Sequence, residues 1–199
     1  MIKAIVFDLN GVFLQSDYLT KRIEEKYSIP SDESLTVLKE SLKDTRLNPE
    51  VRIFEYWVDL FKKYNIEVTE DEFLSFWFSG ESLVNKFIFL SKKLREKGLS
   101  VYIFSNNFKE RTEYYRKNFK EIFENVDNAF FSWEIGYVKS DSKAYTNLLS
   151  MIKVKPDEII YFDDSEENIQ IAKSLGIRAY LYKDFDSTNK VLVENKIEV

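Results

Sequence analysis

The sequence predicts an α/β fold in which helices wind around a parallel β-sheet and a helical bundle interrupts the chain after the first strand. Several runs are apolar on consecutive residues, which suits strands that are covered on both faces. Helical patterns lie between those runs, as in a sheet built by crossover connections. After the first run, nearly ninety residues contain no convincing strand pattern, which indicates an inserted unit rather than a loop.

Short runs rich in β-branched and aromatic residues are expected to form the strands of the sheet. They are Ile2–Asp8, Leu99–Ser105, Ala129–Ser132, Glu158–Asp163 and Ile177–Tyr182. Just before the second run, Leu83, Phe87, Leu90 and Leu94 repeat at helical spacing, and Gly98 follows where a helix can end in a left-handed residue. Strand and helix then alternate, so right-handed crossovers are expected.

The inserted segment is expected to be helical throughout. Its amphipathic stretches read "YLTKRIEEKY", "SDESLTVLKESLKD", "PEVRIFEYWVDLFKKY" and "TEDEFLSFWF". The second and fourth open with Ser31-Asp32-Glu33-Ser34 and Thr69-Glu70-Asp71-Glu72, which are typical of helix N-terminal caps. We therefore expect a core domain of residues 1–15 and 83–199 and a helical cap of residues 16–82.

The pair Asn10-Gly11 in "IVFDLNGVFL" is by itself a strong hairpin signal. The stretch that follows, "VFLQSDYLTKRIEEKY", is not a second alternating strand and is expected to turn helical within a few residues. Gly11 is therefore expected to let the chain leave the end of the first strand without pairing back on it.

Composition restricts the chemistry. The 199 residues include no Cys and no His, which excludes disulfides, thiolate nucleophiles, His-dependent triads and the usual zinc and copper sites. Oxygen-ligated magnesium or calcium is the metal that this inventory favours. The net charge is −5 with acidic and basic residues interspersed, so no basic stripe for nucleic acid is expected.

The start of the chain, "MIKAIVFD", has too short an apolar run for a signal peptide, and no later stretch approaches the length of a membrane span. The absence of Cys suits a reducing compartment. We therefore expect a cytoplasmic protein with no membrane partner. The sequence does not choose between a monomer and a homodimer.

Polar residues follow successive predicted strands. Asp8 ends the first, Ser105-Asn106-Asn107 the second and Asp163-Asp164 the fourth, and Gly136-Tyr137-Val138-Lys139 comes after the third. Ligands of open parallel sheets bind beyond the carboxyl ends of the strands. An acid, a hydroxyl, a lysine and an acid pair are therefore expected to converge in one crevice.

These groups are what phosphoryl transfer to a carboxylate requires. Asp8 could attack phosphorus and form an aspartyl phosphate. Magnesium held by Asp8 and Asp164, with Asp163 as a further candidate ligand, would bring the nucleophile and the phosphate together despite their like charge.

The remaining groups suit phosphate binding. Ser105 and Asn106 can donate hydrogen bonds to phosphoryl oxygens, and Lys139 supplies a positive charge. Lys143 competes with Lys139 for this role, but it is expected to lie one helical turn into the next element and to face water.

At this point the chain resembles the haloacid dehalogenase-like (HAD) hydrolase superfamily, most of whose members are magnesium-dependent phosphatases. The stretches "DLNGV", "FSNN", "GYVKSDSKAY" and "YFDDSEEN" are similar to its four motifs, and the resemblance covers nearly the whole chain. The most specific stretch is "FDDSEENIQIAKSLGI", with its acid pair, following Asn and helix ending at Gly176. The resemblance implies a Rossmann-like core and a C1 helical cap that closes over the substrate.

In detail the chain looks most like the branch that includes alpha-D-glucose-1-phosphate phosphatase and the N-terminal phosphatase domain of epoxide hydrolase. This implies a Mg²⁺-dependent phosphatase that acts on a small phosphorylated metabolite, with sugar phosphates among the candidates. It also implies that the residue at position 10 offers its backbone carbonyl to the metal.

The sequence departs from the family pattern at two positions. Ser140 replaces the frequent Pro after the motif lysine, which should alter the stiffness of the loop more than the chemistry. Asn10 replaces an Asp that in the family protonates the leaving oxygen and later activates water, and an amide cannot exchange protons in that way. General acid–base catalysis typically contributes about 10²- to 10⁴-fold, so slowed turnover is expected.

Several explanations of Asn10 stay open. The favoured one is that the resembled branch tolerates residues other than Asp there; Asp17 could then supply the proton, although an N-cap role suits Asp17 better. The protein could instead bind phosphate or a phosphosugar without turnover, with Asn10 either natural or introduced to arrest catalysis. A 2-haloacid dehalogenase is disfavoured because the acid pair Asp163-Asp164 would be costly without a cation. A protein-interaction module with a vestigial site is the remaining class.

Overall fold

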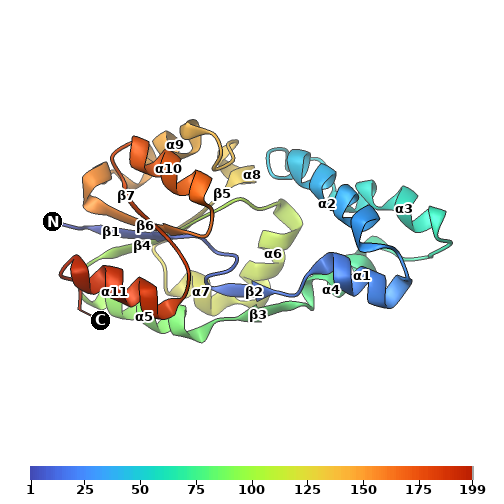
Figure 1. Cartoon of the computed structure of the whole chain (residues 1–199), viewed down its shortest axis with the longest axis horizontal. Helices are drawn as coiled ribbons and strands as arrows, with labels where there is room; N and C mark the ends of the chain where they lie inside the picture. The colour runs from blue at the N-terminus through green and yellow to red at the C-terminus, as the bar shows by residue number, and fades with distance from the viewer. Residues whose placement is uncertain (199) are drawn as a thin grey trace.

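The computed structural model describes residues 1–198 and shows a molecule of two lobes (Figure 1). The larger, which we call the core lobe, contains a five-stranded sheet in the order β5-β4-β1-β6-β7, and every pairing in it is parallel. Its strands are β1 (Ala4–Phe7), β4 (Ser100–Ser105), β5 (Asn128–Phe131), β6 (Ile159–Asp163) and β7 (Arg178–Leu181). All five expected strands and the α/β fold class are confirmed.

The central strand β1 is buried on both faces, as its uninterrupted apolar sequence predicts. Ile5 and Phe7 point into one hydrophobic cluster, whereas Ala4 and Val6 point into another. Helices cover the two faces (Figure 1). The Ile5 face packs on α5 (Asn85–Glu96), α6 (Lys109–Asn118), α7 (Lys120–Glu124) and α11 (Phe185–Glu194), and the Val6 face packs on α9 (Ser142–Ile152) and α10 (Glu166–Ser174).

Short helical segments complete the core lobe. The helix α8 (Ser132–Ile135) follows β5, and the 3-10 turn η2 (Pro156–Glu158) precedes β6. The expected helix end at Gly98 is confirmed, because α5 ends at Glu96 and Gly98 takes a left-handed conformation with φ of 79°.

The second lobe, here called the cap lobe, has a hydrophobic core of its own. It consists of α1 (Leu19–Tyr27), α2 (Ser31–Thr45), η1 (Ile53–Tyr56), α3 (Val58–Lys63) and α4 (Glu70–Phe78). Trp57 and Phe73 pack at its centre with ring centroids 5.0 Å apart, and the ring centroids of Phe61 and Phe73 are 5.2 Å apart. Its aromatic residues therefore fill the lobe, with Phe108 of the core lobe packed against them.

The two lobes are joined by an antiparallel pair of short strands, which we call the linker ladder. It consists of β2 (Leu14–Ser16) and β3 (Glu81–Leu83), with Leu14 opposite Leu83 and Ser16 opposite Glu81. The expectation that the inserted segment is helical throughout is wrong at its two ends. The ladder lies across the proposed domain boundaries, so the division into 1–15 with 83–199 and 16–82 stays a prediction.

The ladder also settles the conformation of Asn10-Gly11. Gly11 has a φ of 83°, and its N–H donates to the carbonyl of Leu14 in a tight turn. The next strand, β2, pairs with β3 and not with β1, so the pair does not form a hairpin on β1.

One of the two expected cap sequences is confirmed. Thr69 and Glu72 form a reciprocal capping box at the start of α4. At α2 the expectation is wrong, because the N-cap is Pro30 and the Ser31 hydroxyl donates instead to Glu24 of α1. Asp17 is likewise not an N-cap: α1 is preceded by Tyr18, which makes no side-chain capping bond.

No helix among residues 1–198 combines the length and the apolar character needed to cross a membrane.

Candidate active site

Three carboxylates gather at the carboxyl edge of the sheet. Asp8 directly follows β1, Asp163 ends β6 and Asp164 comes next in the chain. Because β6 is a neighbour of β1, their ends meet, and one oxygen of each carboxylate lies within 4.8 Å of the others. We call these three residues the acid cluster.

Lys139 reaches the acid cluster from the loop between α8 and α9. Its side chain is 2% exposed, and Nζ lies 2.9 Å from Asp8 Oδ1 and 2.6 Å from Asp163 Oδ2. Burial lowers the pKa of Lys139, but Asp8 and Asp163 outweigh that effect and hold it above its usual value. The lysine is therefore a fixed positive charge between two carboxylates.

The two buried carboxylates differ in their surroundings. Burial raises the pKa of Asp8, opposed by Lys139 and by the N–H of Leu9, which donates to Oδ1 at 2.7 Å. Asp163 is also penalised by burial, but Lys139 and other donors bring its pKa below the usual value. These donors are the Tyr161 hydroxyl and Asn168 Nδ2, the latter at 2.9 Å, and the Ser165 N–H also donates to Asp163 Oδ1 at 2.9 Å.

Asp164 is the exposed member of the cluster, and no other side chain of the described residues donates to it. Burial and the neighbouring Asp163 raise its pKa. A Cβ at Gly11 would stand 3.4 Å from Asp164 Oδ2, so the glycine leaves the space in which this carboxylate sits.

The donor set fits a divalent cation. Three carboxylates face one lysine, which leaves an excess of negative charge that would be costly without a counterion. Carboxylate oxygens at this spacing are the ligands that Mg²⁺ and Ca²⁺ take. Asp163 has both oxygens engaged by protein donors, whereas Asp8 Oδ2 and Asp164 accept none from another side chain in the described part of the chain.

The loop after β4 lies beside the cluster. Ser105 is buried at the end of the strand, and its hydroxyl makes no hydrogen bond within residues 1–198. Asn106 Oδ1 accepts the Lys139 N–H at 2.8 Å, which ties this loop to the lysine loop. Asn107, to which sequence reasoning gave no role, donates from Nδ2 to Asn10 Oδ1 at 3.1 Å; its place beside Asn106 in "FSNN" was the available signal.

Asn10 is held at both ends of its amide. Its Oδ1 accepts from Asn107, and its Nδ2 donates to the Tyr115 hydroxyl at 2.8 Å. Tyr115 lies on α6 and is fully buried, and the Arg111 guanidinium lies 5.4 Å from the centre of its ring. Nothing in the sequence pattern indicated this contact, because position 115 is separated from Asn10 by 105 residues.

The other residues considered from the sequence lie outside the cluster. Lys143 is exposed, as expected, with Nζ 6.0 Å from the Tyr137 ring centre. Asp17 is exposed directly after β2, where its N–H donates to the Gly80 carbonyl at 2.9 Å.

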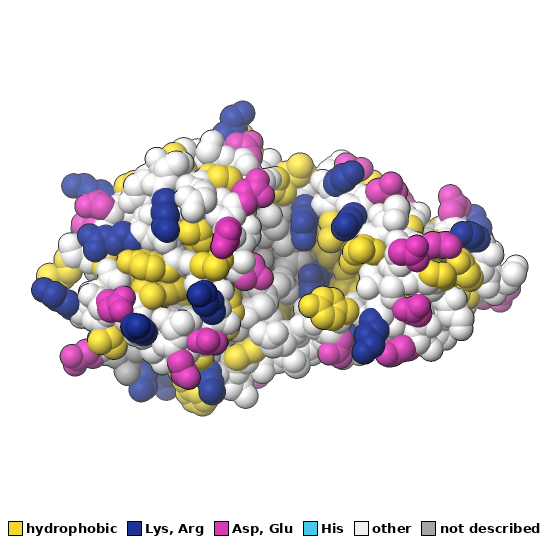
Figure 2. All heavy atoms as spheres, viewed as in Figure 1, with side chains coloured by type: hydrophobic (Ala, Val, Ile, Leu, Met, Phe, Trp, Pro, Cys, Tyr) yellow, Lys and Arg dark blue, Asp and Glu magenta, His cyan; other side chains and the backbone are white. Residues whose placement is uncertain are grey.

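A hollow of about 330 Å³ lies between the lobes, beside Asn106 and the loop that carries Lys139, and we call it the interlobe hollow. Figure 2 shows the surface hollowed at this place, with Lys and Arg side chains on its cap side. Its lining consists of Lys39, Leu42, Lys43, Arg46 and Leu47 from the cap lobe and Asn106, Val138 and Ser140 from the core lobe.

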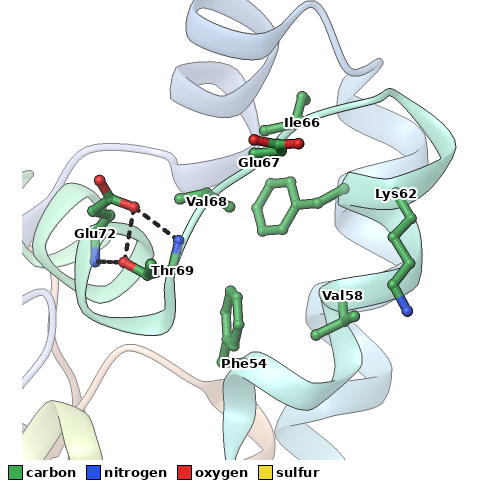
Figure 3. A pocket seen from close by; sticks show the side chains of 9 residues that line it. Phe54, Val58, Lys62, Ile66, Glu67, Val68, Thr69 and Glu72 are labelled. Carbon is green, nitrogen blue, oxygen red and sulfur yellow. Dashed lines mark hydrogen bonds between the residues drawn. The ribbon is translucent and has the colours of Figure 1, made fainter.

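A second hollow of about 440 Å³ lies within the cap lobe (Figure 3). Phe54, Val58 and Val68 point into it, and the capping box of Thr69 and Glu72 lies at its edge. All of its lining residues belong to the cap lobe, so it does not adjoin the acid cluster.

Comparison with known proteins agrees with this geometry. The family of haloacid dehalogenase-like hydrolases matches residues 2–176, and the chain therefore belongs to it. Bifunctional epoxide hydrolase 2 of Sus scrofa is 25% identical over 214 residues, which cover 96% of this chain but only 38% of the relative. Enolase-phosphatase E1 of Aquifex aeolicus is 23% identical over 199 residues, covering 89% of this chain and 88% of the relative.

Solved structures share the fold. A HAD family enzyme of Bacteroides thetaiotaomicron superimposes with a TM-score of 0.82 at 21% identity, covering 96% of this chain and 98% of that one. The wild-type form of that enzyme has also been crystallised with magnesium and inorganic phosphate, and this complex superimposes with a TM-score of 0.75 at 20% identity over 94% of this chain and 99% of that one.

Proposed function

We propose that this hydrolase is a Mg²⁺-dependent phosphatase that acts on a small phosphorylated metabolite through an aspartyl phosphate on Asp8. The observation that carries the proposal is the acid cluster with Lys139 at its centre, at the edge of the sheet where a ligand can enter. The phosphatase among its relatives and the magnesium and phosphate bound by its structural neighbour support the same reaction.

Asp8 is the nucleophile in this proposal. One carboxylate oxygen attacks phosphorus, the bond to the ester oxygen breaks, and the phosphoryl group is transferred to Asp8. Water then attacks the phosphorus of the aspartyl phosphate, which releases inorganic phosphate and regenerates the carboxylate. Lys139, 2.9 Å from Asp8 Oδ1, holds the nucleophile in place and attracts the incoming phosphate.

The metal would be held by Asp8, Asp164 and the backbone carbonyl of Asn10. When bound, Mg²⁺ supplies positive charge between the nucleophile and the phosphate. Asp163 is the weaker candidate ligand, because Lys139, Tyr161, Ser165 and Asn168 already occupy its oxygens. Its proposed role is to position Lys139.

Ser105 and Asn106 are the proposed phosphate donors. The Ser105 hydroxyl has no partner within residues 1–198, and Asn106 uses only Oδ1 in holding the lysine loop, which leaves Nδ2 to donate. Asn10 cannot supply a proton to the leaving oxygen, so turnover is fastest on substrates whose leaving group needs none.

The test is release of inorganic phosphate from acetyl phosphate and p-nitrophenyl phosphate, with Mg²⁺ and with EDTA. We expect Mg²⁺-dependent release that Asp8→Asn abolishes. Asp59→Asn is the matched control, because the Asp59 side chain is 97% exposed on α3. Release that persists in the Asp8 variant or in EDTA would contradict the proposal.

A phosphate-binding protein without turnover is the second candidate, and the observation that favours it is the amide at position 10. In that case phosphate with Mg²⁺ would raise the melting temperature although no substrate is hydrolysed.

A further inference from the structure

Three cationic side chains without carboxylate partners in the described chain lie on one side of helix α2 and its C-terminal end. Lys39, Lys43 and Arg46 follow one another at spacings of four and three residues, which places them on the same side of the helix, and all three line the interlobe hollow. Among residues 1–198, no Asp or Glu forms an ion pair with any of them.

Arg46 is the deepest of the three. Its Nε is buried and has no hydrogen-bond partner within the described chain. Burial lowers the pKa of its guanidinium, Arg111 lowers it further, and the negative charge of Asp8 acts in the opposite direction.

Other arginines near the junction of the lobes have carboxylate partners. Arg111 pairs with Glu81 at 2.6 Å, and Arg52 pairs with Glu70 at 2.7 Å and Glu110 at 3.2 Å. A buried N–H without a partner is costly, so the Nε of Arg46 is the exception that needs an explanation.

The opposite wall of the hollow consists of the proposed phosphate loops. Asn106 and Ser140 belong to the segments that carry Ser105 and Lys139, and no carboxylate of residues 1–198 lines the hollow. A ligand bound against Asn106 and Ser140 would therefore have Arg46 on the facing wall of the hollow. The volume of about 330 Å³ suits a small metabolite.

We propose that the substrate carries a second anionic group, a carboxylate or a second phosphate, which Arg46 binds with the help of Lys39 and Lys43. The proposal rests on the phosphatase function proposed above and adds the class of substrate. A planar guanidinium can bind either anion through two parallel hydrogen bonds. A phosphoester without this group would leave the buried Arg46 Nε unpaired, so the cap lobe would select against it.

Matched pairs of phosphoesters test the proposal by binding, in the presence of Mg²⁺. The first pair is 3-phosphoglycerate and glycerol 3-phosphate, and the second is fructose 1,6-bisphosphate and fructose 6-phosphate. We expect the member with the additional anion to bind about tenfold more tightly in at least one pair, which corresponds to about 1.4 kcal/mol. The pair that discriminates identifies the anion.

Variants assign the preference to α2. Arg46→Gln should abolish it, Arg46→Lys should keep part of it, and the exposed pair Lys39→Gln with Lys43→Gln should weaken it without affecting the fold. Lys62→Gln is the matched control, because Lys62 is an exposed cap-lobe lysine that lines the other hollow. Equal binding within both pairs, or a preference that survives in Arg46→Gln, would overturn the proposal.

The binding measurement separates this proposal from the phosphatase reaction. Absence of phosphate release from acetyl phosphate would refute turnover and leave the binding preference in place. Release from acetyl phosphate with no preference in either pair would refute the second anion and leave the reaction in place.

Discussion

At the scale of a single residue, the contacts of Asn10 predict the effect of replacing it with aspartate. Both of its partners could also donate hydrogen bonds to a carboxylate. Asn107 donates already, and the Tyr115 hydroxyl, which accepts from Asn10, can rotate and donate. Burial raises the pKa of Tyr115 far above its usual value, so its proton remains available. An aspartate at position 10 would therefore fit the existing contacts.

Asn10→Asp should raise kcat for an alkyl phosphate such as glycerol 3-phosphate by about 10²- to 10⁴-fold, the contribution of general acid–base catalysis. The gain on acetyl phosphate should be much smaller, because its leaving group needs no proton. Steady-state phosphate release measures both, with Asn48→Asp as the matched control at an exposed amide whose Oδ1 accepts from the Glu50 N–H. An equal gain on both substrates would show that the aspartate acts in some other way.

The site residues that the sequence predicted are those that end or follow buried strands. Asp8, Asp163 and Asp164 could be placed together because parallel strands present their carboxyl ends at one edge of a sheet. Arg46 and Tyr115 could not, because their positions depend on how a helix packs across a lobe or between lobes. Helical spacing relates them only to residues of their own element.

At the scale of elements, the linker ladder shows where pattern reading fails. Each of its strands has three residues, too few to establish an alternation, and polar residues dominate both. At α2 the reason is different: Ser31 makes a hydrogen bond to Glu24 of another helix in place of the expected local cap. Long apolar runs and the isolated box of Thr69 and Glu72 were predictable because their reasons are local.

A buried ion pair helps to hold the ladder to the core lobe. Arg111 of α6 pairs with Glu81 of β3 at 2.6 Å and donates from Nη2 to Ser16 Oγ of β2 at 2.9 Å. The side chains of Glu81 and Arg111 are 1% and 14% exposed, so the pair is buried. Arg111 also lies against Tyr115, which connects the ladder to Asn10.

Glu81→Gln should destabilise the protein by about 3 kcal/mol, because it leaves the Arg111 charge buried without its partner. Ser16→Ala should cost only about 1 kcal/mol, the value of one hydrogen bond. Urea unfolding of both variants measures the difference, and Ser82→Ala, in the same ladder but exposed, is the control. Equal losses for Glu81→Gln and Ser82→Ala would show that the ion pair does not hold the ladder.

At the scale of the whole molecule, each lobe contains its own apolar core, and the proposed substrate contacts groups from both. The nucleophile and its lysine belong to the core lobe, whereas the proposed anion contacts belong to α2 of the cap lobe, which faces the core lobe across the interlobe hollow (Figure 1). The residues of the proposed reaction could thus be predicted from the sequence, because most of them end or follow strands. Selection of the substrate depends on the packing of two lobes, which the sequence pattern does not describe.

The charge of the acid cluster predicts how the folded protein as a whole responds to metal. Asp8, Asp163 and Asp164 share a single lysine, so the folded state should bind Mg²⁺ and the unfolded chain should not, which makes the melting temperature rise with Mg²⁺ concentration. At a concentration of about 100 times Kd the free energy of unfolding rises by about 2.7 kcal/mol.

Asp164→Asn should abolish this response. It should leave the melting temperature in EDTA unchanged or higher, since it removes a charge whose pKa is raised by burial and by Asp163. Asp157→Asn, an exposed change in η2, should keep the full response. A scan of melting temperature against Mg²⁺ concentration for the three proteins decides the matter, and a full response in Asp164→Asn would mean that the metal binds elsewhere.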